Sequence, residues 1–491
     1  MPVADGTGMP EGIPDEFLGG IPAASEMDTW RRWWEARGAE LSAAVDRAGT
    51  PWLRMYDRTG ARVDTVCMPG GYRELLQRGY AAGIISRVFE HDSLLPFYRL
   101  GYLVAYHDPG LYCPYTVSLA TAVALHKYAS DEVRERFLPP MLRTDEEVWQ
   151  GATWMTEIRG GSDLGSNVDT TAFADGARWR LRGEKYFASN VGAELAVVAA
   201  RPEGAPDGVR GLALYLVPRE RADGTRNYRI RRLKDKIATR SVPTGEVELC
   251  DSEGWLLGAA EQGVYLILEV LNLSRVANAV ASAALAQRAL DEARAFAAQR
   301  VAFGLPVLEQ PLLRAQFAAR RDGLAGAVAL ACAAARELDA VWRLRPPYDA
   351  RYHRFRLLAH LAKYWTAEFA AQTAKWAMEV HGGLGVLAEY PVERGFREAM
   401  ILSIWEGTAH RQILDGLEVM QRRQAHRALL EWLAPWGDAV AAGDLRARLD
   451  AHLALPEARR EAEAEAVFAE LARFTADALR AAGPGAAAGP A

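Results

Sequence analysis

The residues best suited to chemistry stand in the short run Trp405-Glu406-Gly407-Thr408. A carboxylate removes protons at neutral pH when its pKa is raised, and a neighbouring aromatic ring raises it by excluding water. Glu406 lies between Trp405 and Gly407, just ahead of a helix predicted to begin at Thr408. One carboxylate among 63 acidic residues has little prior chance of being a base. This setting nevertheless makes Glu406 the leading candidate for a general base.

A second group of residues lies in the run from Met155 to Asp163, MTEIRGGSD. Its glycines permit a tight turn, and its hydroxyls and backbone N–H groups can hold a polar heterocycle or a phosphate. The same residue types dominate ordinary turns, so this run taken alone is more often only a turn.

A third group ends a stretch of alternating polar and apolar residues, which predicts a strand up to about Asn190. Phe187 and Ser189 are two residues apart, so they face the same side of that strand. An aromatic face beside a hydroxyl suits a flat ring with a polar edge. A buried phenylalanine with a capping serine is the simpler interpretation of this segment alone.

Two further segments end long helical patterns. The run from Arg300 to Gly304, followed by Gln310, offers an arginine for a pyrophosphate and Phe303 to cover an adenine. An arginine there can equally satisfy the carbonyls of a helix C-terminus. The run from Glu379 to Gly385 stops the next pattern at the pair Gly382-Gly383.

The elements that position these segments change from helices to strands and back to helices along the chain. Spacings of three and four between apolar residues predict helices, and short apolar runs bounded by Gly, Pro and Asp predict strands. We therefore expect a helical domain over residues 28–150, a β domain over 151–260 and a helical bundle over 261–430. A helical extension with one more helical pattern is expected over 431–481 and a disordered tail over 482–491. This order predicts an α+β protein and argues against a doubly wound nucleotide-binding fold.

Composition excludes several classes of protein. The 491 residues are half hydrophobic and a quarter charged, as in soluble globular proteins, and the net charge of −5 does not favour nucleic acid as a partner. The four cysteines form no CxxC pair and the histidines form no HExxH, so no metal site is predicted. No apolar run appears long enough for a membrane helix and no signal peptide is evident, which predicts a cytoplasmic protein without a membrane partner.

Together these five segments, in their order along the chain and at their spacings, resemble the acyl-CoA dehydrogenase family of flavoproteins over about residues 100–420. Within that family the chain is similar to the AidB-like branch, which is related to isovaleryl-CoA dehydrogenase. The features that carry this likeness are MYDRTGARVD, GLYCPYTVSLA, MTEIRGGSD, RRLKDKIATRSVPTGEVEL, GWLLG and FGLPVLEQPL.

The resemblance implies a helical domain, a β-barrel-like domain and a helical bundle, with FAD held between the last two. It also implies a homotetramer in which a neighbouring subunit completes the site. Thr156 and Ser162 would lie by the flavin ring or its ribityl chain, Phe187 would pack on the ring, and Ser189 would bond near N5. The other positions that the resemblance assigns to FAD are Met155, Arg300, Phe303, Gln310, Glu379, Gly382, Gly383, Trp405, Thr408 and His410.

The family's chemistry would then be the α,β-dehydrogenation of acyl-CoA or another acyl thioester. Glu406 would remove the α-proton while the β-hydrogen leaves as hydride to flavin N5, and an electron-transfer flavoprotein or another acceptor would reoxidise the flavin. Some members carry the base beside an arginine early in the C-terminal bundle. Here that pair is Ser274-Arg275, and serine cannot serve as the base.

The chain departs from the family pattern in the adenosine and pyrophosphate region. Glu379 and His410 stand where glutamine is common, Ala302 replaces a frequent threonine, and Gln310 comes one residue early. The AidB-like branch shares several of these differences.

Two alternative functions stay open at this point. One is a flavoprotein that mainly binds and protects DNA, but residues 421–491 hold nine arginines, no lysine and ten acidic residues, and the cluster Arg422, Arg423 and Arg427 is small. The other is an acyl-CoA oxidase, which differs in the fate of the reduced flavin.

Overall fold

The computed structural model describes residues 24–48 and 50–483, so most of the predicted disordered tail lies outside the described residues. The chain divides into two compact units, which are described separately here. The sheet unit comprises residues 29–93 and 110–274, and the bundle unit comprises the described residues among 1–28, residues 94–109 and the chain from 275 onwards. The long helix α10 belongs to both units.

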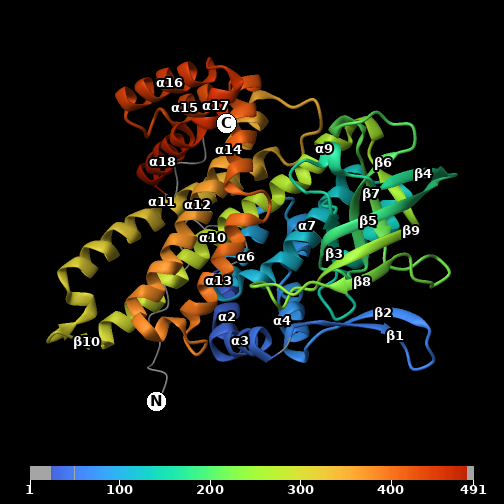
Figure 1. Cartoon of the computed structure of the whole chain (residues 1–491), viewed down its shortest axis with the longest axis horizontal. Helices are drawn as coiled ribbons and strands as arrows, with labels where there is room; N and C mark the ends of the chain where they lie inside the picture. The colour runs from blue at the N-terminus through green and yellow to red at the C-terminus, as the bar shows by residue number, and fades with distance from the viewer. Residues whose placement is uncertain (1–23, 49, 484–491) are drawn as a thin grey trace. The chain divides into compact units, whose positions relative to one another are not determined.

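The sheet unit is built on a seven-stranded sheet that closes on itself (Figure 1). The strands are β3 (Gly151–Trp154), β4 (Thr171–Asp175), β5 (Arg178–Ser189), β6 (Leu195–Pro202), β7 (Ala213–Pro218), β8 (Arg229–Leu233) and β9 (Thr244–Leu257). Their order is β3-β6-β4-β5-β9-β7, β8 pairs with β9, and the additional pairing of β6 with β7 completes a ring. This arrangement is β-barrel-like, as the family resemblance implies.

The barrel closes because apolar side chains of several strands meet inside it. Every residue of β7 is buried, and so are the first six residues of β6. Trp154 packs edge-on against Tyr228 and donates its indole N–H to the carbonyl of Ser189 at 3.1 Å. This bond fixes the end of β5, where two of the predicted site residues lie.

A β-hairpin interrupts the region that sequence analysis assigned to helices. Strands β1 (Trp52–Tyr56) and β2 (Arg62–Cys67) pair antiparallel, and Asp57 accepts hydrogen bonds from the backbone N–H groups of Thr59 and Ala61 in the turn. Short alternating strands with an Asp-Arg-Thr-Gly turn are a hairpin signal that the prediction missed. The surrounding helices are α3 (Ala39–Ala48), α4 (Gly70–Ala81), α5 (Ser86–Glu90), α7 (Pro109–Tyr128) and α8 (Asp131–Met141).

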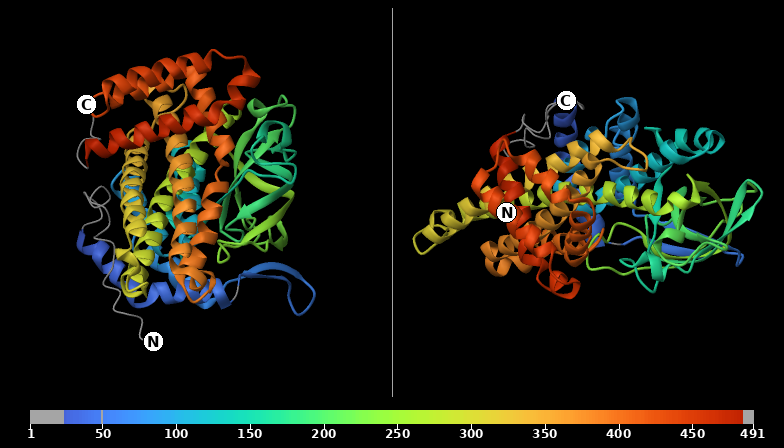
Figure 2. Two further views of the ribbon diagram at one scale, coloured as in Figure 1. Left: turned by 60° about the vertical axis from the view of Figure 1, so that its left-hand side comes forward. Right: turned by 90° about the horizontal axis from the view of Figure 1, so that it is seen from above.

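The bundle unit contains the long helices that the apolar spacing predicts. They are α10 (Gly263–Gln299), α11 (Pro311–Val341) and α12 (Ala350–His381), followed by α13 (Pro391–Ile404) and α14 (Ala409–Arg423), with α6 (Leu95–His107) from earlier in the chain. The small hairpin β10 (Val301–Ala302) and β11 (Leu305–Pro306) lies at the far end of α10 and α11 from α14 (Figures 1 and 2).

The C-terminal extension is more divided than the single helical pattern predicted for it. It holds α15 (Ala425–Leu433), α16 (Ala439–Leu453), α17 (Glu457–Ala462) and α18 (Ala464–Ala482). Asp438 caps the start of α16 through a hydrogen bond from Ala441 N, and Pro456 precedes α17. Asp438 favours a new helix because its side chain accepts a free N-terminal N–H, and Pro456 ends the preceding segment because proline cannot continue a helix.

One helix corrects a sequence-based expectation. Among the described residues, the segment 260–299 contains an 18-residue window apolar enough by composition to cross a membrane, whereas no such stretch was expected. The helix passes the test because charged residues are sparse along its first part, and 72% of that window is buried inside the structure. The core helix of a globular protein passes the same test, so this feature is weak evidence for a membrane span. The predicted α+β class, with helices, strands and long helices in that order, is confirmed.

Candidate active site

The loop between α13 and α14 carries Glu406 in an unusual backbone conformation. Glu406 has φ +59° and Gly407 has φ +97°, so two successive residues are in the left-handed region. A non-glycine residue there costs roughly 1–2 kcal/mol and is often found where function requires it. Thr408 then starts α14 by accepting a hydrogen bond from the backbone N–H of Arg411 at 3.5 Å.

A buried glutamine holds the backbone of this loop. The side-chain amide of Gln412 donates to the carbonyl oxygens of Glu406 and Gly407, both at 3.0 Å. Its own oxygen lies 2.8 Å from Nδ1 of His360, which is fully buried on α12. The conformation of residues 406 and 407 is therefore tied to a neighbouring helix.

Two buried cations approach the same loop from other helices. Arg275 on α10 donates through Nε to the carbonyl of Glu406 at 3.4 Å and pairs with Asp415 at 3.2 Å. Lys363 on α12 donates to the carbonyl of Ser403 at 3.0 Å. Arg275 thus binds a loop carbonyl and Lys363 binds a carbonyl in the last turn of α13, and neither forms an ion pair with the Glu406 carboxylate within the described part of the chain.

The environment favours the neutral form of Glu406. Burial raises the pKa of the Glu406 carboxyl to about 7, while the charges of Arg275 and Lys363 act to lower it. Burial also lowers the pKa of Lys363 to about 8, although Glu406 acts to raise it. A carboxylate with a pKa near 7 is suited to accept a proton at neutral pH. The indole N–H of Trp405, beside it, is buried without a hydrogen-bond partner among the described residues.

The predicted site residues of β5 lie on the outer face of the barrel. Phe187 is 52% exposed and Ser189 is partly exposed, while Ala188 between them is buried in the core. The ammonium of Lys234 lies 4.8 Å from the centre of the Phe187 ring, and Oγ of Ser189 lies 3.3 Å from Oγ1 of Thr244. Phe187 and Ser189 thus share a face, as expected, and a buried phenylalanine is excluded.

A buried ion pair holds the loop after β3 in place. Glu157 accepts from Nζ of Lys185 at 2.6 Å, and both side chains are almost completely buried. This anchor leaves Thr156 partly exposed and Ser162 exposed, whereas Met155 is buried. Glu157 and Lys185 were not among the predicted site residues, and their contribution is to hold the loop in place.

The hairpin after α10 presents its residues to solvent. Phe303, at the tip with φ +52°, is 100% exposed, and Arg300 is also exposed. Gln310 is partly exposed and donates its amide to the carbonyl of Ala302 at 3.0 Å, which closes the hairpin.

The glycine turn after α12 is likewise open. Gly382 has φ +60°, and no atom lies within 4 Å of the position that a Cβ would occupy at Gly382 or Gly383. Glu379 is exposed and pairs with Lys375 at 2.5 Å. His381 stacks on Phe296 with ring centres 4.3 Å apart, so the turn lies at the same end of the bundle as the hairpin after α10.

The bundle unit therefore brings the predicted residues together in two groups. The first group is Trp405, Glu406 and Thr408, with His410 exposed on α14. The second group is Arg300, Phe303, Gln310, Glu379, Gly382 and Gly383. Helix α13 separates them, and its 14 residues span roughly 20 Å at the usual rise per residue.

Sequence analysis missed the buried polar residues that hold the Glu406 loop. They are Arg275, Asn278, His360, Lys363 and Gln412. Two pairs of them, Arg275 with Asn278 and His360 with Lys363, stand three residues apart on buried stretches of α10 and α12, which places each pair on one face. Polar pairs on an apolar face are a signal that could have identified them, because a buried polar group requires a partner.

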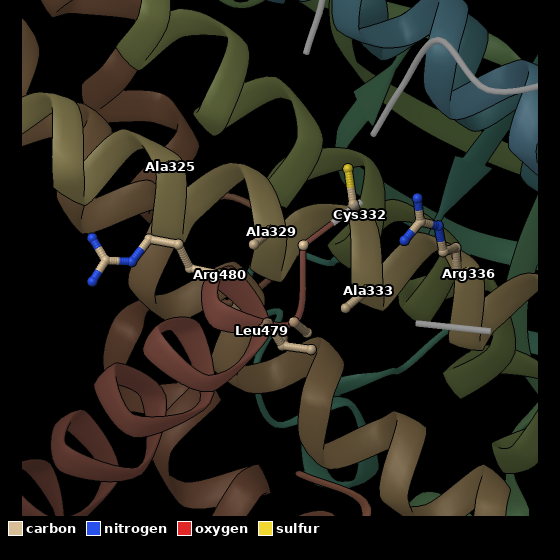
Figure 3. Close-up of a pocket in the computed structure, with 9 residues that line it drawn as sticks. Ala325, Ala329, Cys332, Ala333, Arg336, Leu479 and Arg480 are labelled. Carbon is tan, nitrogen blue, oxygen red and sulfur yellow. The ribbon is translucent and has the colours of Figure 1, made fainter. Parts of the chain in front are cut away.

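A small pocket elsewhere in the bundle unit contains none of these residues. It lies between α11 and the end of α18, has a volume of about 60 Å³, and is lined mainly by alanines with Cys332 and Leu479. In Figure 3 the guanidinium group of Arg480 points away from the pocket on one side, whereas that of Arg336, on the other side, points back toward Cys332. Among the described residues, no group of three or more His, Cys, Asp or Glu could hold a metal ion.

Comparison with sequence families gives three matches in succession along the chain. Residues 25–147 match the N-terminal domain of the adaptive response protein AidB, residues 152–252 match the acyl-CoA dehydrogenase middle domain, and residues 261–421 match the acyl-CoA dehydrogenase C-terminal domain. The putative acyl-CoA dehydrogenase AidB of Escherichia coli is 32% identical over 393 residues, which cover 76% of this chain and 70% of that protein.

Solved structures give the same picture. The Bd2924 apo-form has a TM-score of 0.85 at 26% identity and covers 96% of both chains. Caenorhabditis elegans ACDH-11, solved in complex with C11-CoA, has a TM-score of 0.85 at 24% identity over 95% of this chain and 84% of that one. An acyl-CoA dehydrogenase from Bacillus anthracis complexed with FAD has a TM-score of 0.75 at 17% identity over 96% of this chain and 81% of that one.

Proposed function

Because the chain belongs to the acyl-CoA dehydrogenase family, in its AidB-like branch, we propose that it oxidises an acyl thioester with Glu406 as the base. The observation that carries this proposal is the Glu406 carboxyl, which is only partly exposed, makes no described hydrogen bond, and has its pKa raised to about 7 by burial. Such a group accepts a proton at neutral pH, when a carboxylate of ordinary pKa is a weaker base.

The chain's own residues hold and tune this base. The α-proton of a thioester is weakly acidic, so the base must be kept in line with it and the carbonyl must be hydrogen-bonded. The hydrogen bonds of Gln412 and Arg275 keep the backbone at Glu406 in one conformation. The nearby charges of Arg275 and Lys363 keep part of the Glu406 population ionised against the effect of burial.

The residues of the sheet unit fit FAD as the resemblance implies. The exposed ring of Phe187 and the hydroxyl of Ser189 share one face, which suits a flat ring with a polar edge. Thr156 and Ser162 offer hydroxyls on the anchored loop, and Met155 is buried. By the resemblance, Trp405, Thr408 and His410 would also contact FAD. When bound, FAD supplies the acceptor for the β-hydrogen.

We propose a homotetramer in which a second subunit completes the FAD site. In one chain the hairpin and glycine turn, with Arg300, Phe303, Gln310, Glu379, Gly382 and Gly383, lie a helix length from Glu406. Phe303 is fully exposed at the hairpin tip and Val301, Leu305 and Leu312 near it are also exposed, and an exposed apolar patch is typical of a contact surface. These residues would therefore serve the site of a neighbouring subunit.

The DNA-binding alternative is not favoured. Arg422 pairs with Glu418 at 2.9 Å and Arg427 pairs with Asp450 at 3.1 Å, so two of the three clustered arginines are already paired with acidic residues. Phosphate binding would have to compete with these pairs. The cytoplasmic location stays a prediction, since residues 1–23 lie outside the described part of the chain.

Anaerobic titration of the purified protein with acyl-CoAs of graded chain length tests the proposal. We expect a bound yellow chromophore that one class of acyl-CoA bleaches, with C11-CoA, the ligand of ACDH-11, included in the panel. Reoxidation by electron-transfer flavoprotein and not by oxygen would identify a dehydrogenase, and rapid reoxidation by oxygen would identify an oxidase. A bound flavin that no acyl-CoA bleaches, together with salt-sensitive DNA binding, would contradict the proposal.

A further inference from the structure

We propose that Gln412 and Lys363 are positioning residues for the base: Gln412 holds the Glu406 loop in the left-handed conformation that aims the carboxylate, and Lys363 holds the C-terminal end of α13, from which that loop leaves. This inference rests on the proposed role of Glu406. Neither residue is required to touch the substrate, since Gln412 acts through carbonyl oxygens of the loop and Lys363 through the carbonyl of Ser403 in the last turn of α13.

The amide of Gln412 donates to the carbonyls of two successive loop residues. Its amide nitrogen lies 3.0 Å from the oxygens of both Glu406 and Gly407, and its side chain is completely buried. A Cβ at Gly407 would lie 2.6 Å from this nitrogen, so the absence of a side chain there is what lets the amide approach. The hydrogen bonds of Gln412 therefore hold the left-handed turn, and Gln412 can approach only because residue 407 has no side chain.

His360 sets the direction in which the Gln412 amide points. Nδ1 of His360 donates to Oε1 of Gln412, which turns the NH₂ group toward the loop. Burial and the charge of Arg275 lower the pKa of His360 to about 3, so the ring stays neutral at working pH. Its Nε2 is buried with no partner among the described residues. The hydrogen bonds that run from His360 through Gln412 to the loop therefore stay the same across the working pH range.

Lys363, on α12, is buried against the C-terminal end of α13. Its side chain is 1% exposed, and its described hydrogen bond is to the carbonyl of Ser403 in the last turn of that helix. In the described part of the chain no carboxylate forms an ion pair with it. A buried ammonium without an ion pair lowers stability, so a function for its charge would account for its presence. The hydrogen bond places the ammonium at the carbonyl three residues before Glu406, and its charge favours the ionised form of that carboxyl.

Several other charged or titratable groups interact with Arg275, Lys363 or Asp415 near the base. They are Arg275 on α10, Arg356, His360 and Glu368 on α12, and Arg411 and Asp415 on α14. Arg411 and Arg275 both pair with Asp415, which leaves Lys363 as the buried cation without a paired acid in this part of the described structure. Changing Lys363 should therefore alter the titration of Glu406 without breaking an ion pair.

The Gln412→Met variant tests the positioning role, because methionine has a similar size but donates no hydrogen bond. We expect bound flavin and acyl-CoA KM within about threefold of the parent, and kcat about 10- to 100-fold lower, since a misplaced base loses rate and not binding. The crystal structure of the variant should show Glu406 outside the left-handed region. The control is Thr373→Val, which removes a buried hydroxyl without a described partner on the same helix as Lys363 and should change neither quantity.

A pair of variants at Lys363 separates charge from packing. In Lys363→Met the acid limb of the kcat/KM profile should move to higher pH by about one pH unit, because a nearby positive charge is lost. Lys363→Arg keeps the charge, so the acid limb of its profile should lie within a few tenths of a pH unit of that of the parent. A purely structural role would lower activity equally at all pH values in both variants, and that result overturns the inference for Lys363.

The Glu406→Gln variant, measured in parallel, keeps this inference distinguishable from the proposed function. If Glu406→Gln is inactive while Gln412→Met and Lys363→Met keep full kcat and the parent pH profile, the positioning roles are wrong and the base is retained. If Glu406→Gln is fully active, the proposed function fails first. Should Gln412→Met fold poorly, His360→Asn, which leaves the glutamine but not its orienting ring, should lower kcat at unchanged KM. Parent kcat in that variant overturns the role of Gln412.

Discussion

The Glu406 loop and the hairpin tip at Phe303 begin from the same backbone conformation and have opposite surroundings. Both residues are non-glycine, have φ between +50° and +60°, and precede a glycine that also has positive φ. Around Glu406, buried side chains from three helices bind carbonyls of the loop and of the last turn of α13 that leads into it. Around Phe303, one amide from Gln310 closes a hairpin whose tip is fully exposed.

This difference indicates which parts of the site a single chain can complete. A strained conformation persists only when its surroundings hold it. The Glu406 loop is held by its own chain, so we expect it to be formed before any ligand binds. The hairpin lacks such support within the described chain, and its exposed phenylalanine suits a contact with another subunit. The following predictions test this contrast, from the largest expected effect to the smallest.

Matched glycine-to-alanine variants in the two turns should differ most in their free energies of unfolding. In Gly407→Ala the new Cβ would lie 2.6 Å from Nε2 of Gln412, whereas at Gly304 no atom lies within 4 Å. Both glycines have positive φ, so each variant carries a strain of about 1 kcal/mol, and Gly407→Ala adds a clash of about 1–3 kcal/mol. Chemical denaturation should show this difference in the free energy of unfolding. Equal losses would mean that the two turns are equally supported.

Glu406→Gln should gain stability relative to the parent as the pH rises. The carboxyl has a pKa of about 7 in the folded chain and an ordinary pKa when unfolded, so the folded state favours the protonated form. Its stabilising contribution is present at pH 4 and is lost as the pH rises through 7. The variant should therefore be similar to the parent at pH 4 and more stable by up to about 3 kcal/mol at pH 8. Identical pH dependence in the two proteins would show that Glu406 is not held in a desolvating site.

Phe303→Ala should leave the folded chain almost unchanged and affect assembly. A fully exposed side chain contributes little to the fold, so the free energy of unfolding of the dissociated chain should change by no more than about 0.5 kcal/mol. We expect weaker subunit association and loss of bound flavin, measured by analytical ultracentrifugation and absorbance. Unchanged assembly and flavin content would remove the reason for assigning the hairpin to a partner's site.

The smallest effect is expected for Glu379→Gln. The ion pair of Glu379 with Lys375 is exposed on both sides, and exposed pairs contribute at most about 1 kcal/mol. Thermal denaturation should therefore detect little change. The variant restores the residue common in the family, so flavin affinity should stay the same or rise. A fall in flavin affinity would show that Glu379 itself contacts the cofactor.

The sequence predicts the α+β class and the order of helices and strands because these follow from local periodicity. The stops at Gly382 and the start near Thr408 are likewise local signals, and both agree with the structure. Glu406 could be singled out by its neighbours Trp405 and Gly407, and the raised pKa agrees in direction with that expectation.

The support of the base could not be predicted from local pattern. Lys363 and Gln412 meet at one loop only after α12, α13 and α14 have packed, and a single polar residue in a helical sequence is usually an exposed one. The missed hairpin Trp52–Cys67 and the several helices of the extension have a different cause. Their short elements were averaged into one helical pattern, although the turn at Asp57 and the cap at Asp438 mark the breaks.

The most direct measurement is the anaerobic bleaching of bound flavin by a reactive acyl-CoA in the parent and in Glu406→Gln. The two proteins should bind flavin and acyl-CoA alike, and bleaching in the variant should be slower by about 10²- to 10⁴-fold or undetectable, because the group that takes the α-proton has been removed. Bleaching at the parent rate in the variant would contradict the account.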